Sequence, residues 1–208
     1  MTPTRPVVSA TLAAIFAAIV AAQEPEALII DPSQTTITLH VGRAGVFAFA
    51  GHDHEVVAPA VQGQITLDRL NVSRSTLSAT FDATALKVTG KGEPSEDVPE
   101  VQRVMLSDRV LDVQRHPTIT FRSRQVSVVK QSADQMTLRI TGDLTLHGVT
   151  QRLDVPVTVQ LTGAGLRATG TTTVQQSQFG MRPVTAGAGT VRVKDEVEVV
   201  FSVTATRR

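Results

Sequence analysis

The segment LDVPVTVQL (residues 153–161) alternates apolar and polar residues throughout. Successive side chains of a β-strand point to opposite faces, so this segment predicts a strand with one apolar and one polar face. The same alternation recurs in Ile37-Leu39-Val41, Leu77-Ala79-Phe81, Leu138-Ile140 and Val197-Val199-Phe201-Val203. The chain is therefore predicted to consist mainly of half-buried strands.

Glycine-containing breaks separate these runs at spacings typical of antiparallel hairpins and bends, at positions 42, 63, 142, 148, 163–165 and 187–189. About eight to ten strands fit between the breaks. That number is enough for an all-β antiparallel barrel or sandwich.

One amphipathic helix is predicted between Asp97 and Arg115, where apolar residues recur at helical spacing. The residues of this stripe are Val98, Val101, Met105 and Leu111. A capping box of Asp97 with Glu100 predicts the start of the helix, and His116-Pro117 predicts its end. We expect this helix, preceded by a polar loop over residues 90–96, to pack across one open end or flank of the sheet.

Two irregularities are expected within the strands. Apolar parity shifts between Phe121 and Val126, which predicts a β-bulge near residues 123–125. One parity persists from Val191 to Ala205, much longer than an ordinary strand, and a bend is expected at Lys194-Asp195. Asp195 is interpreted as a rim residue at that bend, because burying a charge on the apolar face would be costly.

Composition excludes several classes of protein. There is no cysteine, which excludes disulfides and thiolate-bound metals, and the chain has neither Trp nor Tyr. The charges balance at 20 basic and 19 acidic residues, so no general attraction to nucleic acid is expected. No nucleophile elbow, phosphate loop, dinucleotide fingerprint or zinc-protease helix is present in the sequence, and the protein is not expected to be an enzyme.

The N-terminus is predicted to be a targeting segment. Residues 1–6 carry one cation, Arg5, and an apolar run follows from Val7 to Ala22. That run is short for a transmembrane helix, and its small last residues suit cleavage after Ala22. We expect a signal peptide over residues 1–22 and a periplasmic or secreted mature chain over residues 23–208, with an uncleaved anchor as the alternative.

The motif His52-Asp53-His54 allows three interpretations. Two histidines two positions apart share one face of an extended segment, as paired metal ligands on strands do. Two ligands are too few, and His40, His116, His147, Asp53, Glu55 or Asp195 would have to complete a metal site or a metal-dependent enzyme. A polar rim that contacts a ligand head group, with His147 and Asp195, is the second interpretation. A purely structural turn is the third.

The order of several motifs along the mature chain resembles the YceI-like family. These motifs are Asp31 with residues 36–41, GQITLD at 63–68, PTITF at 117–121, TGDLTLHGVT at 141–150, FGM at 179–181 and DEV at 195–197. The resemblance implies a lipocalin-like antiparallel barrel of about eight strands, exported to the bacterial periplasm. It also implies that the interior holds a polyisoprenoid chain, such as a quinone or polyprenyl lipid. His52 to Glu55, and His116 in place of an aromatic residue, depart from the family pattern.

The resemblance and the strand parity together predict the residues of the lumen. An eight-stranded barrel is wide enough for one small ligand, and every second residue points inward. The expected ligand-binding residues are Phe47, Phe49, Leu77, Phe81, Phe121, Leu138, Ile140, Leu144, Leu146, Val157, Val199 and Phe201. No cofactor is expected. The expected partner is an isoprenoid lipid or quinone, with transient membrane contact, in a monomer or homodimer. Without the resemblance, the same residues could equally fill a solid core.

Overall fold

The computed structural model describes residues 24–45, 52–59, 61–186 and 191–207. The predicted lumen residues Phe47 and Phe49, and the predicted signal segment 1–22, lie outside them. The strands are β1 (Glu26–Ile30), β2 (Thr36–Ala44), β3 (His54–Val57), β4 (Val61–Leu67), β5 (Thr76–Asp82), β6 (Lys87–Val88), β7 (Thr118–Gln131), β8 (Gln135–Leu146), β9 (Val149–Leu161), β10 (Gly165–Gln175), β11 (Thr185–Ala186) and β12 (Val191–Thr206). The helix is α1 (Val98–Leu106), and short 3₁₀ turns are η1 (Pro32–Gln34), η3 (Val72–Arg74), η4 (Ala83–Ala85) and η5 (Gln176–Phe179).

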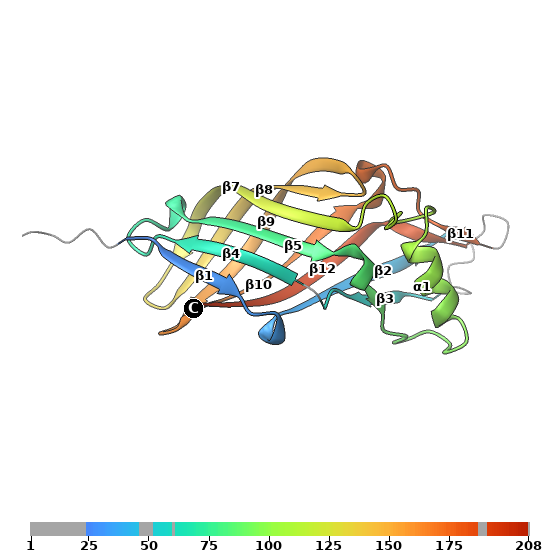
Figure 1. The fold of residues 1–208 in the computed structure, drawn as a ribbon, viewed down its shortest axis with the longest axis horizontal. Coiled ribbons are helices and arrows are strands. Elements are labelled where there is room, and N and C mark those ends of the chain that lie inside the picture. Colours follow the sequence, from blue (N-terminus) through green and yellow to red (C-terminus); the bar gives the residue numbers. More distant parts are fainter. Residues whose placement is uncertain (1–23, 46–51, 60, 187–190, 208) are drawn as a thin grey trace, which may run out of the picture.

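Eight of these strands close into an antiparallel barrel. The order around the barrel is β1, β4, β5, β7, β8, β9, β10 and β12, and β12 pairs back onto β1. The closing pairs are Ile29 with Thr206 and Ile30 with Ala205. The predicted all-β barrel is confirmed, and the ribbon shows its long tilted strands (Figure 1).

The sheet continues beyond the barrel at one end. β2 pairs with β12 from Arg192 to Ser202, β3 pairs with β2, and β6 pairs with β3. This extension lies at the same end as α1 and β11 (Figure 1). The end that carries α1 is therefore built from more elements than the end where β1 begins.

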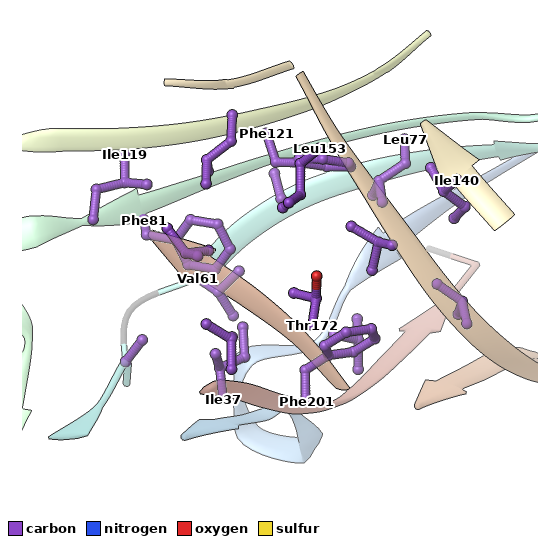
Figure 2. Close-up of a pocket in the computed structure, with 18 of the residues that line it drawn as sticks. Ile37, Val61, Leu77, Phe81, Ile119, Phe121, Ile140, Leu153, Thr172 and Phe201 are labelled. Carbon is purple, nitrogen blue, oxygen red and sulfur yellow. The ribbon is translucent and has the colours of Figure 1, made fainter. Parts of the chain in front are cut away.

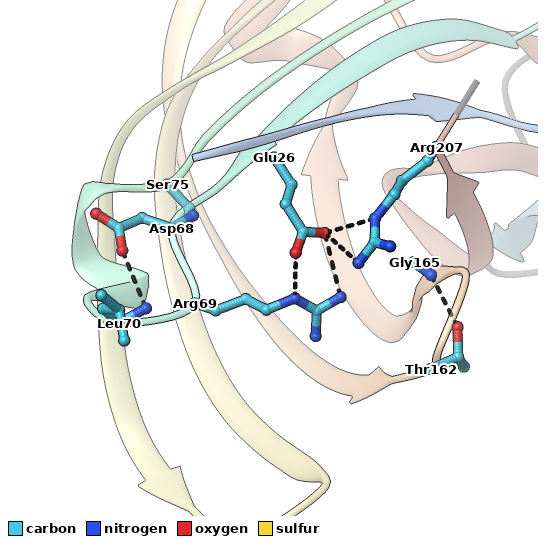
Figure 3. Close-up of polar contacts among 8 residues, drawn as sticks. All are labelled: Glu26, Asp68, Arg69, Leu70, Ser75, Thr162, Gly165 and Arg207. Carbon is cyan, nitrogen blue, oxygen red and sulfur yellow. Dashed lines mark hydrogen bonds and ion pairs between the residues drawn. The ribbon is translucent and has the colours of Figure 1, made fainter. Parts of the chain in front are cut away.

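An ion-pair cluster fastens the opposite end, where the barrel closes. The Glu26 carboxylate accepts a hydrogen bond from Arg69 Nε at 2.7 Å and lies 3.0 Å from Arg207 Nη2 (Figure 3). Asp68 Oδ1 organises the neighbouring turn by accepting the N–H groups of Leu70 and Asn71. The guanidinium groups of Arg69 and Arg207 hold the pKa of Glu26 below its ordinary value.

Both predicted strand irregularities are confirmed. The pairing of β7 with β8 shifts register between Ser123 and Gln125, and a second shift follows between Val128 and Lys130. The pairing of β12 with β2 shifts between Val193 and Val197, around the predicted bend. Such bulges increase local twist, which a long strand needs in order to follow a barrel wall.

The predicted helix exists but is shorter than expected. α1 ends at Leu106 rather than near Arg115, because Ser107 is extended and its hydroxyl donates to the Val104 carbonyl. The predicted capping box is wrong. Asp97 makes no side-chain capping bond, and Glu100 pairs with Arg103 instead. Leu111 is still buried, but it is placed by the turns that follow the helix.

Candidate functional site

The barrel encloses a cavity of about 330 Å³. Side chains from β5, β7, β10 and β12, among them Phe81, Phe121, Thr172 and Phe201, point into this shared space (Figure 2). Among the residues that the structure describes, the wall contains no charged side chain, and its polar members are Ser75, Thr76, Thr172 and Gln176. The cavity is therefore an almost wholly apolar compartment.

The residues that face the cavity alternate along the strands, as the sequence predicted. In β9, Val155, Val157 and Val159 are 5–9% exposed, whereas the intervening Pro156 and Thr158 face outward and are less buried. All ten predicted lumen residues that the structure describes lie on the wall: Leu77, Phe81, Phe121, Leu138, Ile140, Leu144, Leu146, Val157, Val199 and Phe201. Whether they contact a ligand stays a prediction.

The sequence analysis missed the residues that close the cavity at the α1 end. Met105 of α1, Val110 and Leu111 from the following turns, and Met181 after η5 also line the cavity. The apolar stripe of Met105 and Leu111 was the available signal for two of them. Met181 follows an irregular segment, where no periodicity could reveal its direction.

A second, polar depression lies outside this closed end. Val110 and Met181 line both the cavity and the depression, so the two spaces adjoin at these side chains. The outer walls carry Asp108, Arg109, His147 and Arg182. An apolar interior thus adjoins a charged surface at the end of the barrel that α1 covers.

The helix α1 buries little of its surface against that end of the barrel. None of the nine residues of α1 is fully buried. Its apolar residues Val98, Val101 and Met105 are half-buried and pack against the edge of the core. An element that buries little surface can open at lower free energy than the barrel beneath it.

The histidine motif holds the loop before α1. His54 Nδ1 lies 3.0 Å from Glu93 Oε2, and the Glu93 side chain is wholly shielded from solvent. The neighbouring Glu55 pairs with Lys91 at 3.1 Å and accepts a hydrogen bond from Thr89. These contacts of His54 and Glu55 fit the interpretation of the motif as a structural turn. His52 is half-buried and lies just before β3. A role for His52 and His54 towards a ligand head group stays a prediction.

The other two predicted rim residues hold η5 in place. His147 Nδ1 donates to the Phe179 carbonyl at 3.1 Å, since a carbonyl oxygen can only accept. Asp195 accepts the backbone N–H of Ser177 at 2.7 Å and the Ser177 hydroxyl. Neither side chain lines the cavity, but His147 borders the outer depression.

The fold and cavity agree with comparisons to known proteins. Residues 28–205 match the family model described as the YceI-like domain. This chain belongs to the YceI-like domain family. The match begins within β1 and ends within β12, so the closed barrel is the YceI-like domain.

Relatives of the YceI-like barrel occur in several bacteria. A UPF0312 protein of Pseudomonas aeruginosa is 30% identical over 160 residues, covering 70% of each chain. Among solved structures, BcnA of Burkholderia cenocepacia superposes with a TM-score of 0.64 at 19% identity, over 84% of this chain and 98% of that one. A polyisoprenoid binding domain from Saccharophagus degradans has a TM-score of 0.63 at 12% identity, over 87% and 98%. At such identities the two structures show a shared fold.

Two further observations concern the described part of the YceI-like domain. No helix there combines the length and apolar character needed to cross a membrane. Within the same residues, His52 and His54 gather no third donor, and the trio of potential metal ligands that does converge is Asp112, His116 and His147. The predicted alternative of a metal site at His52 and His54 therefore has no third ligand among the described residues, and it stays a prediction.

Proposed function

We propose that this YceI-like protein is an exported binding protein that holds a polyisoprenoid or similar amphiphilic lipid, such as a quinone, for carriage or storage. One observation carries the proposal. The barrel encloses a cavity whose described wall residues include no charged side chain and four polar ones among an apolar majority. The fold shared with a polyisoprenoid binding domain supports the same class of ligand.

The chemistry of the wall favours a hydrocarbon ligand. Each CH₂ group moved from water into such a cavity gains about 0.8 kcal/mol and requires no hydrogen-bond partner. The cavity volume of about 330 Å³ lies within the range of roughly 300–1,000 Å³ typical of small-molecule sites. A charged substrate would lose its hydration here without compensation, so we propose binding without catalysis.

We propose that the ligand enters at the α1 end. The cavity and the polar depression share Val110 and Met181 in their walls, and α1 at this end buries little surface. Movement of residues 98–117 would open this end while the barrel strands stay paired. The apolar stripe of α1 would then be exposed and could contact a membrane during transfer.

The proposal includes export, from the signal peptide expected over residues 1–22. Expression of the full chain in a bacterium, followed by fractionation and mass measurement of the mature protein, tests it. A periplasmic product that begins at Gln23 is expected. A full-length product retained in the cytoplasm would contradict export without affecting the binding proposal.

Adjacent residues of β12 provide a matched test of lipid binding. Phe201 lines the cavity, whereas Val200 is 37% exposed on the outer face. Native mass spectrometry after incubation with a polyprenyl quinone should show retention by the wild type and by Val200→Arg. Phe201→Arg should lose it, because the charge enters an apolar space.

Thermal unfolding of each variant shows whether it is folded. If Phe201→Arg does not fold, Leu144→Gln serves as the second variant, since it places an uncharged amide at the cavity wall. A folded lumen variant that retains as much quinone as the wild type would overturn the proposal. So would a wild type that retains no polyprenyl compound.

A further inference from the structure

We propose that Asp112, His116 and His147 form a binding site for a divalent transition metal, with Zn²⁺ as the reference ion. The carboxylate and the two imidazoles each offer one ligand atom, and these atoms lie within 4.8 Å of one another. None of the three side chains lines the cavity. The site is therefore separate from the proposed lipid compartment.

The donor set suits such an ion. Two histidines and one carboxylate form the protein ligands of many zinc and iron sites, which keep a further position for water. Zinc bonds of about 2.0–2.1 Å place tetrahedral ligand atoms about 3.4 Å apart. Side-chain movements of about 1 Å would bring the trio to that geometry.

His147 has the hydrogen-bonding pattern of a metal-binding histidine. Its Nδ1 donates to the Phe179 carbonyl, which leaves the lone pair on Nε2. Metal-binding histidines commonly donate their second nitrogen to a carbonyl in this way, and the contact fixes both tautomer and ring orientation. His147 is the first residue of the two-residue turn between β8 and β9, with a left-handed φ of 51°.

The second residue of that turn makes room for His116. A Cβ added at Gly148 would lie 2.6 Å from Cε1 and 2.9 Å from Nδ1 of the His116 ring. The absence of a side chain there lets His116 approach His147, and the ring centroids are 4.9 Å apart in an edge-on arrangement. The turn thus supplies one imidazole and accommodates the other.

Asp112 is held in place by its backbone. Its N–H donates to the Ser107 carbonyl, and its own carbonyl accepts the N–H of His116, each at 2.8 Å. Asp112 is buried and has a left-handed φ of 45°. In the described part of the chain, Asp112 and His147 are the two non-glycine residues with a positive φ. Both unusual conformations therefore belong to the proposed ligands.

The nearest competing cation is Arg115. Its Nη1 lies 3.1 Å from Asp112 Oδ2, and the Arg115 side chain is 77% exposed. The Asp112 carboxylate is largely shielded, but solvent around the Arg115 guanidinium weakens the pair, and a metal ion can displace it. Among the described side chains, no hydrogen bond joins any two of the three donors to each other. A bound cation would connect them and tie the segment after α1 to the β8–β9 turn.

Zinc titration of the mature protein tests the site. Calorimetry in competition with a chelator of known affinity should find one Zn²⁺ per chain. His147→Asn keeps a side chain suited to the turn, His116→Phe keeps a ring over Gly148, and Asp112→Asn keeps the shape of the carboxylate. Each should weaken zinc binding by more than about 100-fold, since loss of even an outer partner costs metal sites about 10- to 100-fold.

Four control variants make the result specific. The variants His52→Ala and His54→Ala should bind zinc like the wild type, and Arg115→Ala should bind it more tightly because a competing charge is removed. Phe201→Arg, if folded, should also retain zinc, so a failed lipid proposal and a failed metal proposal are distinguishable. A wild type without stoichiometric zinc uptake, or folded trio variants with undiminished uptake, would overturn the proposal.

Discussion

The side-chain amide of Gln102 pairs with the backbone of Val88, whose N–H donates to Gln102 Oε1 at 2.8 Å. The same amide donates from Nε2 to the Leu86 carbonyl at 2.9 Å. Gln102 therefore satisfies the free edge of β6 as a neighbouring strand would, and it attaches α1 to the sheet. Because α1 has no fully buried residue, this polar contact is a main restraint on the helix.

Removing that contact should loosen the helix. In Gln102→Ala, the Val88 N–H and the Leu86 carbonyl lose their partner, and both residues are buried. Leaving such groups unsatisfied costs about 1–3 kcal/mol. We expect faster amide exchange over residues 101–111 and faster lipid release, whereas Arg103→Ala, which removes only an exposed ion pair with Glu100, should change both much less. Equal exchange in both variants would show that packing alone holds α1.

Ligand binding should have the opposite effect on the same segment. If the α1 end closes over a bound lipid, amide exchange over residues 101–111 slows more on loading than exchange in the strand 153–161. Hydrogen-exchange mass spectrometry with and without a polyprenyl quinone measures both segments at once. Equal changes in the two segments would identify the helix as a fixed support.

Acid should weaken the closure of the barrel. The pKa of Glu26 lies below its ordinary value of 4.5 because Arg69 and Arg207 stabilise the carboxylate. The contribution of the Glu26 ion pairs to the stability of the folded protein is therefore complete at pH values above the ordinary pKa of a glutamate. It is lost as the pH falls through the lowered pKa of Glu26.

Denaturant unfolding at several pH values, compared between the wild type and Glu26→Gln, measures this effect. The wild type should be the more stable protein at neutral pH, and the two should converge in acid. Since Asp143 and other carboxyls with lowered pKa values are common to both proteins, only the difference reports on Glu26. A difference that does not change with pH would contradict the assignment.

Glycine 142 should not tolerate a side chain. A Cβ there would fall against the Phe121 ring and lie 2.7 Å from the Arg122 carbonyl, which cannot rotate away. Overpacking of this kind costs about 1–3 kcal/mol, so Gly142→Ala should unfold at a lower temperature. Gly163→Ala is the matched control, because a Cβ at Gly163 meets no atom within 4 Å. Equal unfolding temperatures would show that the ring of Phe121 relocates.

The alternation of apolar and polar residues was sufficient to predict the strands and the face to which each side chain points. The alternation in residues 153–161 predicted which valines of β9 face the cavity, and the parity shift after Phe121 predicted the bulge of β7. Parity alone could not distinguish a cavity from a filled core, because both have the same apolar face.

Contacts between distant segments could not be predicted in this way. The helix ends early because of one hydroxyl bond from Ser107, and apolar spacing does not encode it. His116 and His147 are brought together by the pairing of β7 with β8. The conspicuous pair His52 and His54 is separated by one residue and gathers no third donor among the described residues. The proximity of Asp112, His116 and His147 is visible only in the tertiary structure.

The pairing of β1 with β12 also constrains the order in which the barrel folds. Strands β7 to β10 follow one another through short hairpins and can pair early, whereas Glu26 and Arg207 are 181 positions apart. Contacts across such a separation carry a large loop-closure entropy and form late in folding. The cavity that we propose as the lipid compartment therefore forms only once β12 has paired with β1, so a nascent chain that lacks β12 has no closed compartment.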